Sequence, residues 1–376
     1  MMKAIINGKI IKENEILENK VLLFNETIVD ICDEVQVNCE IIDAKGMYVS
    51  PGLIDIHIHG SNNFDAMDTT KEAVDIISTS IARNGVTSFL PTTMTMSKDR
   101  IYCALDNIRN AMKSTSGAKV LGAHLEGPFI NEKYKGAQNA EFIQNPSFEF
   151  IKEYKDIIKI ISYAPENDTD FLFTKYIKQN TDIVLSMAHT DCNYDLGKKY
   201  VDLGVSNITH LFNAMTPLNH REPGMVGLAL TKNVYCEMIA DKIHVNSEMF
   251  DFVIKNKGID KLILITDSMR AANLEDGEYD LGGQRVIVKN NAARLENGSL
   301  AGSVLTLNSA VKNFYENSSL DIVKSINLAS INPAKSISID KHKGSLEIGK
   351  DADIALFDSN MNCHMTIVEG TIVYKK

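Results

Sequence analysis

The amino-acid sequence predicts an α/β protein: a (β/α)8 barrel over residues 51–335, with a small β domain built from residues 1–50 and 336–376. Two observations predict this fold. Apolar runs of strand length recur eight times in the middle of the chain, mostly separated by segments long enough for a helix. Both ends of the chain instead contain short β-type runs separated by turn residues such as Asn-Gly.

The middle region alternates between strand-like and helix-like segments. The eight predicted strands are residues 53–59, 86–91, 119–125, 159–164, 183–189, 205–211, 234–240 and 262–267. Predicted helices include residues 70–84, 98–113, 147–157, 170–179, 194–203 and 247–255. A doubly wound open sheet is the alternative, but no Gly-x-Gly-x-x-Gly follows the first strand, so a dinucleotide site lacks its sequence signature.

Two stretches interrupt this alternation. Residues 216–230 contain Pro and Gly and are expected to form a loop between strands six and seven. Residues 281–300 carry Gly-Gly and Asn-Gly turns and predict a β-hairpin inserted after strand eight. Such insertions sit over the face where barrel sites are built. We expect the two β-rich ends to share one small domain; two separate flaps are the alternative.

Composition excludes several classes of function. The formal net charge of -10 argues against nucleic acid as a partner, although a single local arginine would suffice for a phosphorylated small molecule. The first residues lack the apolar core of a signal peptide, and no apolar run approaches the length needed to span a bilayer. Six scattered cysteines without a Cys-x-x-Cys pair predict free thiols in a reducing compartment. We therefore expect a cytoplasmic protein.

Ligand-type residues stand at the carboxyl ends of five predicted strands. His57 and His59 are two apart on strand one, so their side chains point to the same face. The other strands contribute Glu126, His189, His210 and Asp267. A buried charge or imidazole is costly unless it is paired or binds a metal. These residues therefore predict one site at the mouth of the barrel.

The residue types at this mouth favour hydrolysis. Three His or Glu ligands with an open position are typical of a catalytic metal site. Such a metal lowers the pKa of bound water to about 7 and polarises a carbonyl group. Asp267, a carboxylate outside that ligand set, could accept the proton of the water and later deliver it to a leaving group. This combination predicts metal-assisted hydrolysis.

At this point the chain resembles a known family. His57-x-His59, the histidines on strands five and six and the aspartate on strand eight resemble the amidohydrolase superfamily and, within it, the N-acetylglucosamine-6-phosphate deacetylases. The stretches that carry the resemblance are His124-Leu125-Glu126-Gly127-Pro128-Phe129, Thr209-His210-Leu211-Phe212-Asn213-Ala214-Met215, His220-Arg221-Glu222-Pro223-Gly224, Thr266-Asp267-Ser268-Met269-Arg270-Ala271, Leu300-Ala301-Gly302-Ser303 and the tail from Gly344 to Asp353. The similarity runs essentially end to end, and the family fold agrees with the predicted one.

The resemblance implies roles for the residues at the mouth. Glu126, His189 and His210 would hold a divalent metal, zinc or iron, and Asp267 would be the general base and then the general acid. His57 and His59 would bind a second metal in the members that use two. One or two metal ions per subunit are therefore expected.

The resemblance also implies a substrate, an N-acetylamino-sugar 6-phosphate. The backbone at Asn213 and Ala214 and the side chains of Arg221 and His244 match substrate contacts. In the family that arginine comes from the neighbouring subunit, which implies a homodimer; its guanidinium suits a phosphate. Gln138 replaces a histidine that helps to polarise the acetyl carbonyl in many members, and its amide could donate to the same oxygen.

Further residues near these motifs are given no role. Lys242 stands where the family commonly has glycine, and we expect it to point to solvent. His124 shares a face with Glu126, but the family does not use it as a metal ligand. His342 and His364 lie in the β-rich tail and are expected at the surface.

Three rival functions stay open. The galactosamine isomer differs from the expected substrate at one hydroxyl, and no residue decides between them. A cyclic-amide hydrolase of the same superfamily would typically use a carbamylated lysine at the end of strand four, where this chain has none. A sugar-phosphate sensor or scaffold would be expected to lose Asp267 or a metal ligand, and all of them are present.

Overall fold

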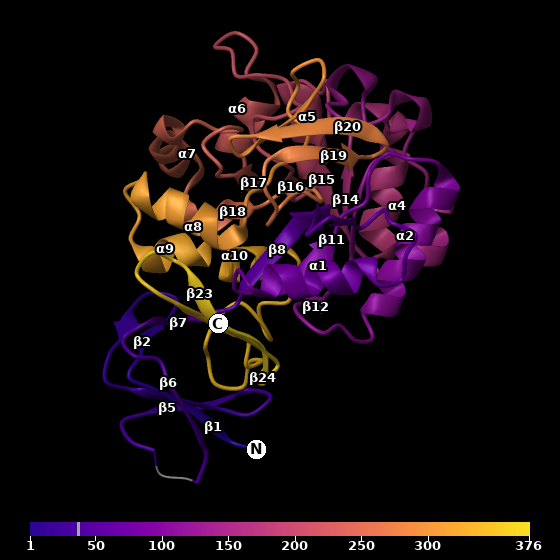
Figure 1. The fold of residues 1–376 in the computed structure, drawn as a ribbon. Coiled ribbons are helices and arrows are strands. Elements are labelled where there is room, and N and C mark those ends of the chain that lie inside the picture. Colours follow the sequence, from indigo (N-terminus) through magenta and orange to yellow (C-terminus); the bar gives the residue numbers. More distant parts are fainter. Residues whose placement is uncertain (36–37) are drawn as a thin grey trace.

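The computed structural model describes residues 1–35 and 38–376, and its centre is a curled parallel sheet (Figure 1). One part of this sheet is formed by β8 (Leu53–Ile58), β11 (Val86–Pro91) and β12 (Lys119–Val120). The other contains β13 (Ala123–Glu126), β14 (Ile158–Tyr163), β15 (Val184–Met187), β16 (Asn207–Ile208), β17 (Tyr235–Ile239) and β18 (Leu262–Ile265). Each strand pairs with its neighbour in chain order, whereas a doubly wound sheet reverses its order; that alternative is therefore wrong.

The two parts of the sheet meet at both of their edges. Thr92, just after β11, forms a parallel bridge with His124 on β13. At the opposite edge the backbone N–H of Asp267, which follows β18, donates to the carbonyl oxygen of His57 at 2.9 Å. All eight predicted strands are observed in the predicted order, although β16 covers only two residues and strand three is interrupted between β12 and β13.

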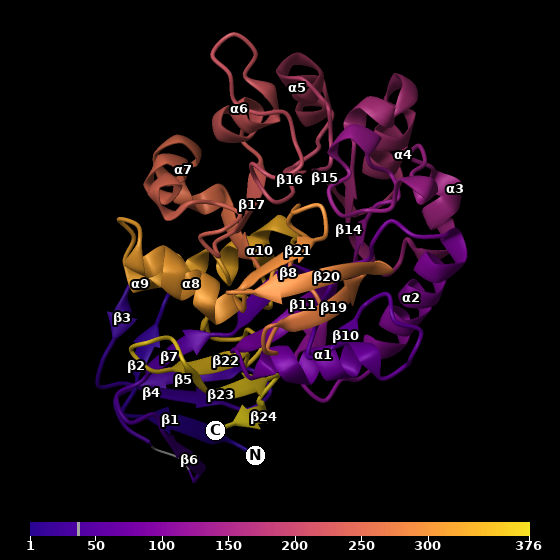
Figure 2. The same cartoon turned by 45° about the horizontal axis from the view of Figure 1, so that its top comes forward.

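Helices cover the outside of the sheet (Figure 2). They are α1 (Ala73–Ala82), α2 (Lys98–Ala111), α3 (Phe148–Ile151), α4 (Leu172–Asn180), α5 (Tyr194–Asp202), α6 (Gly224–Thr231), α7 (Phe250–Lys257), α8 (Leu307–Glu316), α9 (Ile322–Asn327) and α10 (Ile331–Ser336). Helix α2 illustrates why these segments are helical, because its buried Ile101, Leu105 and Ile108 recur at helical spacing. All residues of β8 are buried, as expected for a sheet covered on both faces.

Two predicted irregular stretches need correction. Residues 216–230 are not wholly a loop, because α6 begins at Gly224. Every residue from Met225 to Leu230 is buried, so this helix has no polar face and its sequence lacks the amphipathic pattern that reveals most helices. The insertion after strand eight is larger than a hairpin. It contains β19 (Gly277–Leu281), β20 (Gln284–Lys289) and β21 (Ala292–Leu295), with Gly282-Gly283 turning between the first two.

The two ends of the chain share one β structure, so the alternative of two separate flaps is wrong. One sheet contains β5 (Ile28–Cys32), β4 (Val21–Phe24), β1 (Lys3–Ile6) and β6 (Glu40–Asp43). The second contains β24 (Thr371–Lys375), β23 (Cys363–Val368), β22 (Ile354–Phe357), β7 (Tyr48–Pro51), β2 (Lys9–Ile11) and β3 (Ile16–Leu17). Strands β7 and β22 pair antiparallel, and Phe24 of the first sheet shares an apolar cluster with Leu356 of the second. The exact domain boundaries stay predictions.

Candidate metal centre and active site

The carboxylate of Glu126, at the end of β13, lies at the centre of the predicted site. Its Oε1 atom is 3.3 Å from Nε2 of His189 and 3.2 Å from Nε2 of His210. The two Nε2 atoms are themselves 3.1 Å apart. These three atoms therefore form a nearly equilateral triangle. Ligand bonds of about 2.0–2.1 Å at tetrahedral angles separate neighbouring ligand atoms by roughly 3.3 Å, so the triangle has the size of one face of a metal coordination tetrahedron.

A second group of ligand atoms lies on the other side of Glu126. Nε2 of His59 is 3.3 Å from Oε2 of Glu126 and 3.2 Å from Oδ1 of Asp267. Nε2 of His57 is 3.4 Å from Oε1 of Glu126 and 3.6 Å from Oδ1 of Asp267. Together with the first triangle, these residues make up the mouth layer: His57, His59, Glu126, His189, His210 and Asp267. The structure therefore brings every predicted metal ligand and the predicted general base together.

The histidines of the mouth layer present the same ring nitrogen to the site. Nδ1 of His59 faces the carbonyl oxygen of Thr92 at 3.2 Å, Nδ1 of His189 faces that of Tyr134 at 2.8 Å, and Nδ1 of His210 faces that of Asn213 at 3.1 Å. A carbonyl oxygen only accepts, so each Nδ1 carries the proton and each Nε2 offers a lone pair. Two such lone pairs 3.1 Å apart repel each other unless a cation lies between them. The residues therefore fit a divalent metal.

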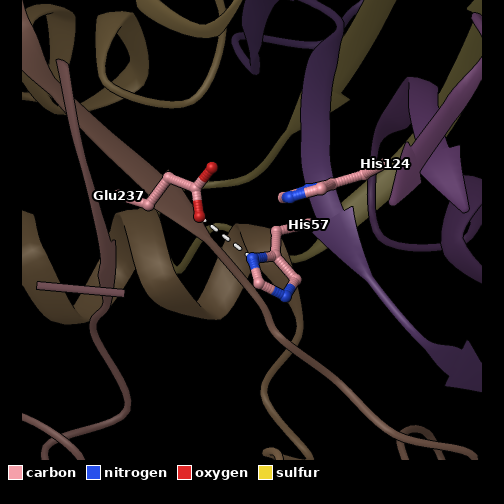
Figure 3. Close-up of side chains that lie close together, drawn as sticks. All are labelled: His57, His124 and Glu237. Carbon is pink, nitrogen blue, oxygen red and sulfur yellow. Dashed lines mark hydrogen bonds and ion pairs between the residues drawn. The ribbon is translucent and has the colours of Figure 1, made fainter. Parts of the chain in front are cut away.

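The fourth histidine, His57, has a carboxylate instead of a carbonyl at Nδ1. Oε2 of Glu237, on β17, lies 2.9 Å from this nitrogen (Figure 3). The side chain of Glu237 is fully buried. Sequence reasoning assigned nothing to this residue, although a carboxylate inside the apolar run 234–240 is a signal that could have been used.

Three residues of the mouth layer have a left-handed backbone. The φ angles are 45° at His189, 31° at His210 and 48° at Asp267, and each residue follows the end of a strand. Residues other than glycine rarely adopt this conformation, and such strain clusters at functional sites. The turn directs each side chain into the mouth of the sheet instead of continuing the alternation of the strand.

The electrostatics of the mouth layer favour positive charge among its carboxylates. Burial alone would raise the pKa of Glu126, but the surrounding histidines, His57 first, hold it well below its usual range. Asp267 behaves in the same way, with its pKa lowered to about 2 by His57 and His59. Conversely, burial opposes charge on His59, yet Asp267 and Glu126 raise the pKa of this imidazole to about 10. A cluster with this balance attracts cations.

A second set of polar residues, which we call the buried layer, stands earlier along the same strands: His124, Ser162, Ser186 and Thr209. Nδ1 of His124 bonds to the carbonyl oxygen of Ile56 and Nε2 to Oγ of Ser162, both at 2.8 Å. Oγ1 of Thr209 lies 2.6 Å from the hydroxyls of both Ser162 and Ser186. Burial, followed by the nearby His57, lowers the pKa of His124 well below its usual value. Both nitrogens of this neutral ring are engaged, so His124 is not available to a metal.

A cavity of about 340 Å³ opens above the mouth layer. Its size suits a small ligand. The predicted substrate residues that line it are Gln138, Asn213, Ala214 and His244. The insertion after strand eight contributes Leu281, Ser299 and Leu300 to the wall. Its strand β20 also reaches the opposite loop, where the Gln284 side chain donates to the carbonyl oxygen of Ala137.

Two residues of the cavity wall have partners that hold them in place. Nε2 of Gln138 donates to Oε2 of Glu126 at 2.8 Å, and its Oε1 accepts from the backbone N–H of Thr95 at 2.6 Å. Nδ1 of His244 lies 2.6 Å from Oδ2 of Asp241. Burial opposes charge on His244, but the hydrogen bond to Asp241 raises its pKa. The intervening Lys242 is exposed at a φ of 67°, a conformation that suits glycine.

The remaining predicted residues lie away from the mouth layer. Arg221 is exposed on the loop before α6 and lines a neighbouring cavity together with Lys133 and Asp191, not the cavity above the metal ligands. The structure therefore does not place Arg221 beside a substrate bound in the cavity of the same chain. All six cysteines are free thiols, as predicted. No helix within residues 1–35 and 38–376 has the length and apolarity to cross a membrane.

Comparisons with known proteins agree with this geometry. The amidohydrolase family model matches residues 48–373. The N-acetylglucosamine-6-phosphate deacetylase of Bacillus subtilis (strain 168) is 39% identical, and the match covers 97% of this chain and 95% of that protein. The N-acetylgalactosamine-6-phosphate deacetylase of Escherichia coli O157:H7 is 30% identical over 97% of each chain. The crystal structure of N-acetylglucosamine-6-phosphate deacetylase from Pasteurella multocida superposes with a TM-score of 0.94 at 29% identity and 99% coverage of both chains.

Proposed function

Because this chain belongs to the amidohydrolase family, we propose that it hydrolyses the N-acetyl group of N-acetylglucosamine 6-phosphate to give glucosamine 6-phosphate and acetate. The observation that carries the proposal is the triangle of Glu126, His189 and His210 beside Asp267, at the base of a cavity sized for a small ligand. Relatives at 36–39% identity carry the name of this activity, which supports the same reading.

Two sets of residues in the mouth layer form two positions for a metal. Glu126, His189 and His210 would hold one divalent ion, and His57 and His59, which lie next to Glu126, would contribute to a second position. A bound metal of this kind lowers the pKa of a bound water to about 7 and polarises the acetyl carbonyl. Imidazole and carboxylate ligands suit zinc and also iron. The backbone and side-chain acceptors at each Nδ1 keep the rings oriented for this task.

Asp267 moves the proton. One carboxylate oxygen accepts a proton from water as the water oxygen bonds to the acetyl carbon. Asp267 then gives that proton to the amine nitrogen as the carbon–nitrogen bond breaks, which releases a neutral amine and acetic acid. The second proton of the water leaves on the acid, which ionises to acetate in solution while the amine takes up a proton. The low pKa of Asp267 keeps the carboxylate ionised and ready to accept before the reaction begins.

The residues around the cavity bind and orient the substrate. Gln138 can direct its amide towards the acetyl oxygen while it remains bonded to Glu126. Asn213, Ala214 and His244 also line the cavity, and in this proposal they bind the sugar phosphate. In a homodimer, Arg221 contacts the phosphate of the substrate that is bound to the neighbouring subunit. The exposed position of Arg221 outside the cavity of its own chain fits this role.

Finer features of the architecture and location belong to the same proposal. The contacts at both edges of the parallel sheet support one closed eight-stranded barrel. The shared apolar cluster of the two terminal sheets supports a small β-sandwich. A cytoplasmic location stays a prediction.

The N-acetylgalactosamine isomer is a second candidate substrate. The relative from Escherichia coli O157:H7 that bears this name matches the chain over nearly its full length, although at lower identity than several glucosamine-named relatives. The identities therefore favour the glucosamine isomer as the main substrate.

Acetate release tests the proposal directly. We would measure it from N-acetylglucosamine 6-phosphate, from the galactosamine isomer and from the unphosphorylated sugar, before and after chelation and after metal is restored. Chelator-sensitive turnover that requires the phosphate and favours the glucosamine isomer is expected. Absence of turnover in protein that contains metal would overturn the substrate assignment, and faster turnover of the galactosamine isomer would select the second candidate.

Mixed subunits test the placement of Arg221. Arg221→Ala and Asp267→Asn should each be inactive alone. If Arg221 acts in the partner's site, random reassembly of the two variants creates one intact site in each mixed dimer and recovers about a quarter of wild-type activity per chain. If Arg221 acts within its own chain, mixing restores nothing.

A further inference from the structure

Glu237 occupies an unusual position for a carboxylate. It lies in the middle of β17, its side chain is fully buried, and its Oε2 atom is 2.9 Å from Nδ1 of His57 (Figure 3). Its other oxygen, Oε1, has no hydrogen-bond partner among the described residues. A buried carboxylate with a single partner is costly to the fold, so the interaction with His57 calls for an explanation other than stability.

His57 differs from the other histidines of the mouth layer in the acceptor at Nδ1. His59, His189 and His210 each face a neutral carbonyl oxygen. His57 instead lies among three carboxylates: Glu237 is at Nδ1, and Glu126 and Asp267 are 3.4 and 3.6 Å from Nε2. A neutral amide or carbonyl would be enough to orient the ring. The negative charge of Glu237 additionally makes Nε2 a stronger donor, as in carboxylate–histidine–metal arrangements.

A separate metal site around Glu237 is ruled out by the same contacts. Ligand-type atoms of His57, His124 and Glu237 do lie within 4.8 Å of one another. However, both nitrogens of His124 bond to protein oxygens, at Ile56 and Ser162. Nδ1 of His57 is engaged with Glu237 itself. The nitrogens of His57 and His124 that face Glu237 or the buried layer are therefore occupied by protein atoms and are not free to bind a metal there.

We propose that Glu237 is a positioning residue that acts through His57 to set the affinity of the second metal position, the one formed by His57, His59 and Glu126. This inference rests on the metal-binding part of the proposed function. Glu237 keeps the proton of His57 on Nδ1, and its negative charge makes the lone pair of Nε2 a stronger donor to the metal. The triangle of Glu126, His189 and His210 contains no atom that Glu237 contacts and is linked to Glu237 only through His57 and the shared Glu126, so we expect the first metal position to keep its affinity.

Metal titration of the isosteric variant Glu237→Gln tests this proposal. Metal-depleted full-length protein would be titrated with Zn²⁺ against a coloured chelator, and metal per chain would be counted by mass spectrometry. We expect wild type to take about two equivalents, and Glu237→Gln to bind the second about 10–100-fold more weakly with the first unchanged. Asp168→Asn is a matched control, because Asp168 is a buried carboxylate whose hydrogen bonds, among the described residues, come from backbone N–H groups at the start of α4. This variant should change neither affinity.

Several results would overturn the proposal. They are an unchanged second affinity in Glu237→Gln, equal weakening of both positions, and a wild-type protein that takes up only one equivalent. A double variant adds a stricter condition: in a His57→Asn background, Glu237→Gln should weaken metal binding no further, whereas an additional loss would mean that Glu237 acts by another route.

The tautomer of His57 in the wild type provides a second test that does not depend on the folding of a variant. Should Glu237→Gln fail to fold, nitrogen-15 NMR of zinc-loaded wild type still reports the tautomer: a proton on Nδ1 of His57 is expected, and a proton on Nε2 contradicts the proposal. The titrations also use no substrate. Failure to release acetate would therefore overturn the proposed reaction while the effect of Glu237 on the second metal could still be observed, and the reverse outcome is equally distinguishable.

Discussion

At the mouth of the parallel sheet, Nε2 atoms of two histidines lie 3.1 Å apart with a carboxylate oxygen beside both, whereas in the buried layer both nitrogens of His124 are bonded to protein oxygens. The two layers use similar residue types, and the rings of His57 and His124 are only 4.6 Å apart. What separates the two layers is whether the ring nitrogens converge on one point or each bond to a separate protein oxygen. Histidine nitrogens that converge on one another and on a shared carboxylate at the mouth indicate a site for a cation, and separate hydrogen-bond partners for each nitrogen of His124 indicate a structural role.

The buried layer also links the strands that carry the mouth layer. The hydroxyls of Ser162, Ser186 and Thr209 form a continuous chain under the mouth layer, ending on Nε2 of His124. A fully paired buried network specifies one arrangement of the strands that carry it. The strands that hold Glu126, His189 and His210 are thus fixed relative to one another before any ligand binds.

The largest expected effect comes from Asp267 in the mouth layer. Asp267→Asn removes the group that accepts and returns the proton, and general acid–base catalysis contributes about 10²–10⁴-fold to a rate. We expect a loss of kcat in that range, with metal at the triangle of Glu126, His189 and His210 retained. Acetate release and metal content measured on the same preparation check this. Retention of a tenth or more of wild-type kcat would remove Asp267 from its role.

A matched pair of histidine variants tests the difference between the layers. His189→Asn should weaken the first metal position by at least about 100-fold, because it removes a ligand directly. His124→Asn should leave metal stoichiometry unchanged but lower the free energy of unfolding by about 1–3 kcal/mol, because it breaks buried hydrogen bonds. Chelator competition and urea unfolding on both variants provide the measurements. Loss of metal from His124→Asn would break the comparison.

Much of the mouth layer was predictable because parallel strands bring their carboxyl ends to one edge. That rule alone placed Glu126, His189, His210 and Asp267 together from residues up to 141 positions apart, as the structure confirms. The contact between His57 and Glu237 was not predictable in this way. It spans 180 positions and depends on how the sheet curls to bring β8 near β17.

Local conformation set a second limit on prediction. The left-handed backbone at His189, His210 and Asp267 could not be read from the sequence, because aspartate and histidine adopt this conformation more often than most residues but still only in a minority of cases. Helix α6 was missed for a different reason, since its two glycines and unbroken apolar character conceal the helical period. In both cases tertiary packing overrides local preference.

Gln138 lies at the mouth but, like the residues of the buried layer, has hydrogen-bond partners within the protein. Its side chain bonds Glu126 and the backbone of Thr95. Gln138→Ala should free Oε2 of Glu126 and weaken metal binding by about tenfold, with a comparable loss in kcat. Gln138→Glu tests charge separately, because a second carboxylate beside Glu126 would strengthen metal retention while removing the amide donor. Unchanged metal affinity in Gln138→Ala would limit Gln138 to substrate contacts.

The smallest expected effect on activity concerns Ser162 in the buried layer. Its hydroxyl joins Nε2 of His124 to Oγ1 of Thr209, so Ser162→Ala leaves buried partners unpaired and should cost about 1–3 kcal/mol of unfolding free energy. Ser88→Ala is the control, because the buried hydroxyl of Ser88 has no hydrogen-bond partner among the described residues and its removal should cost little. Urea unfolding compares the two, and metal content should be unchanged in both. Equal stability of the variants would mean that the buried layer contributes no net hydrogen-bond energy, and the contrast between the layers would then rest on the mouth alone.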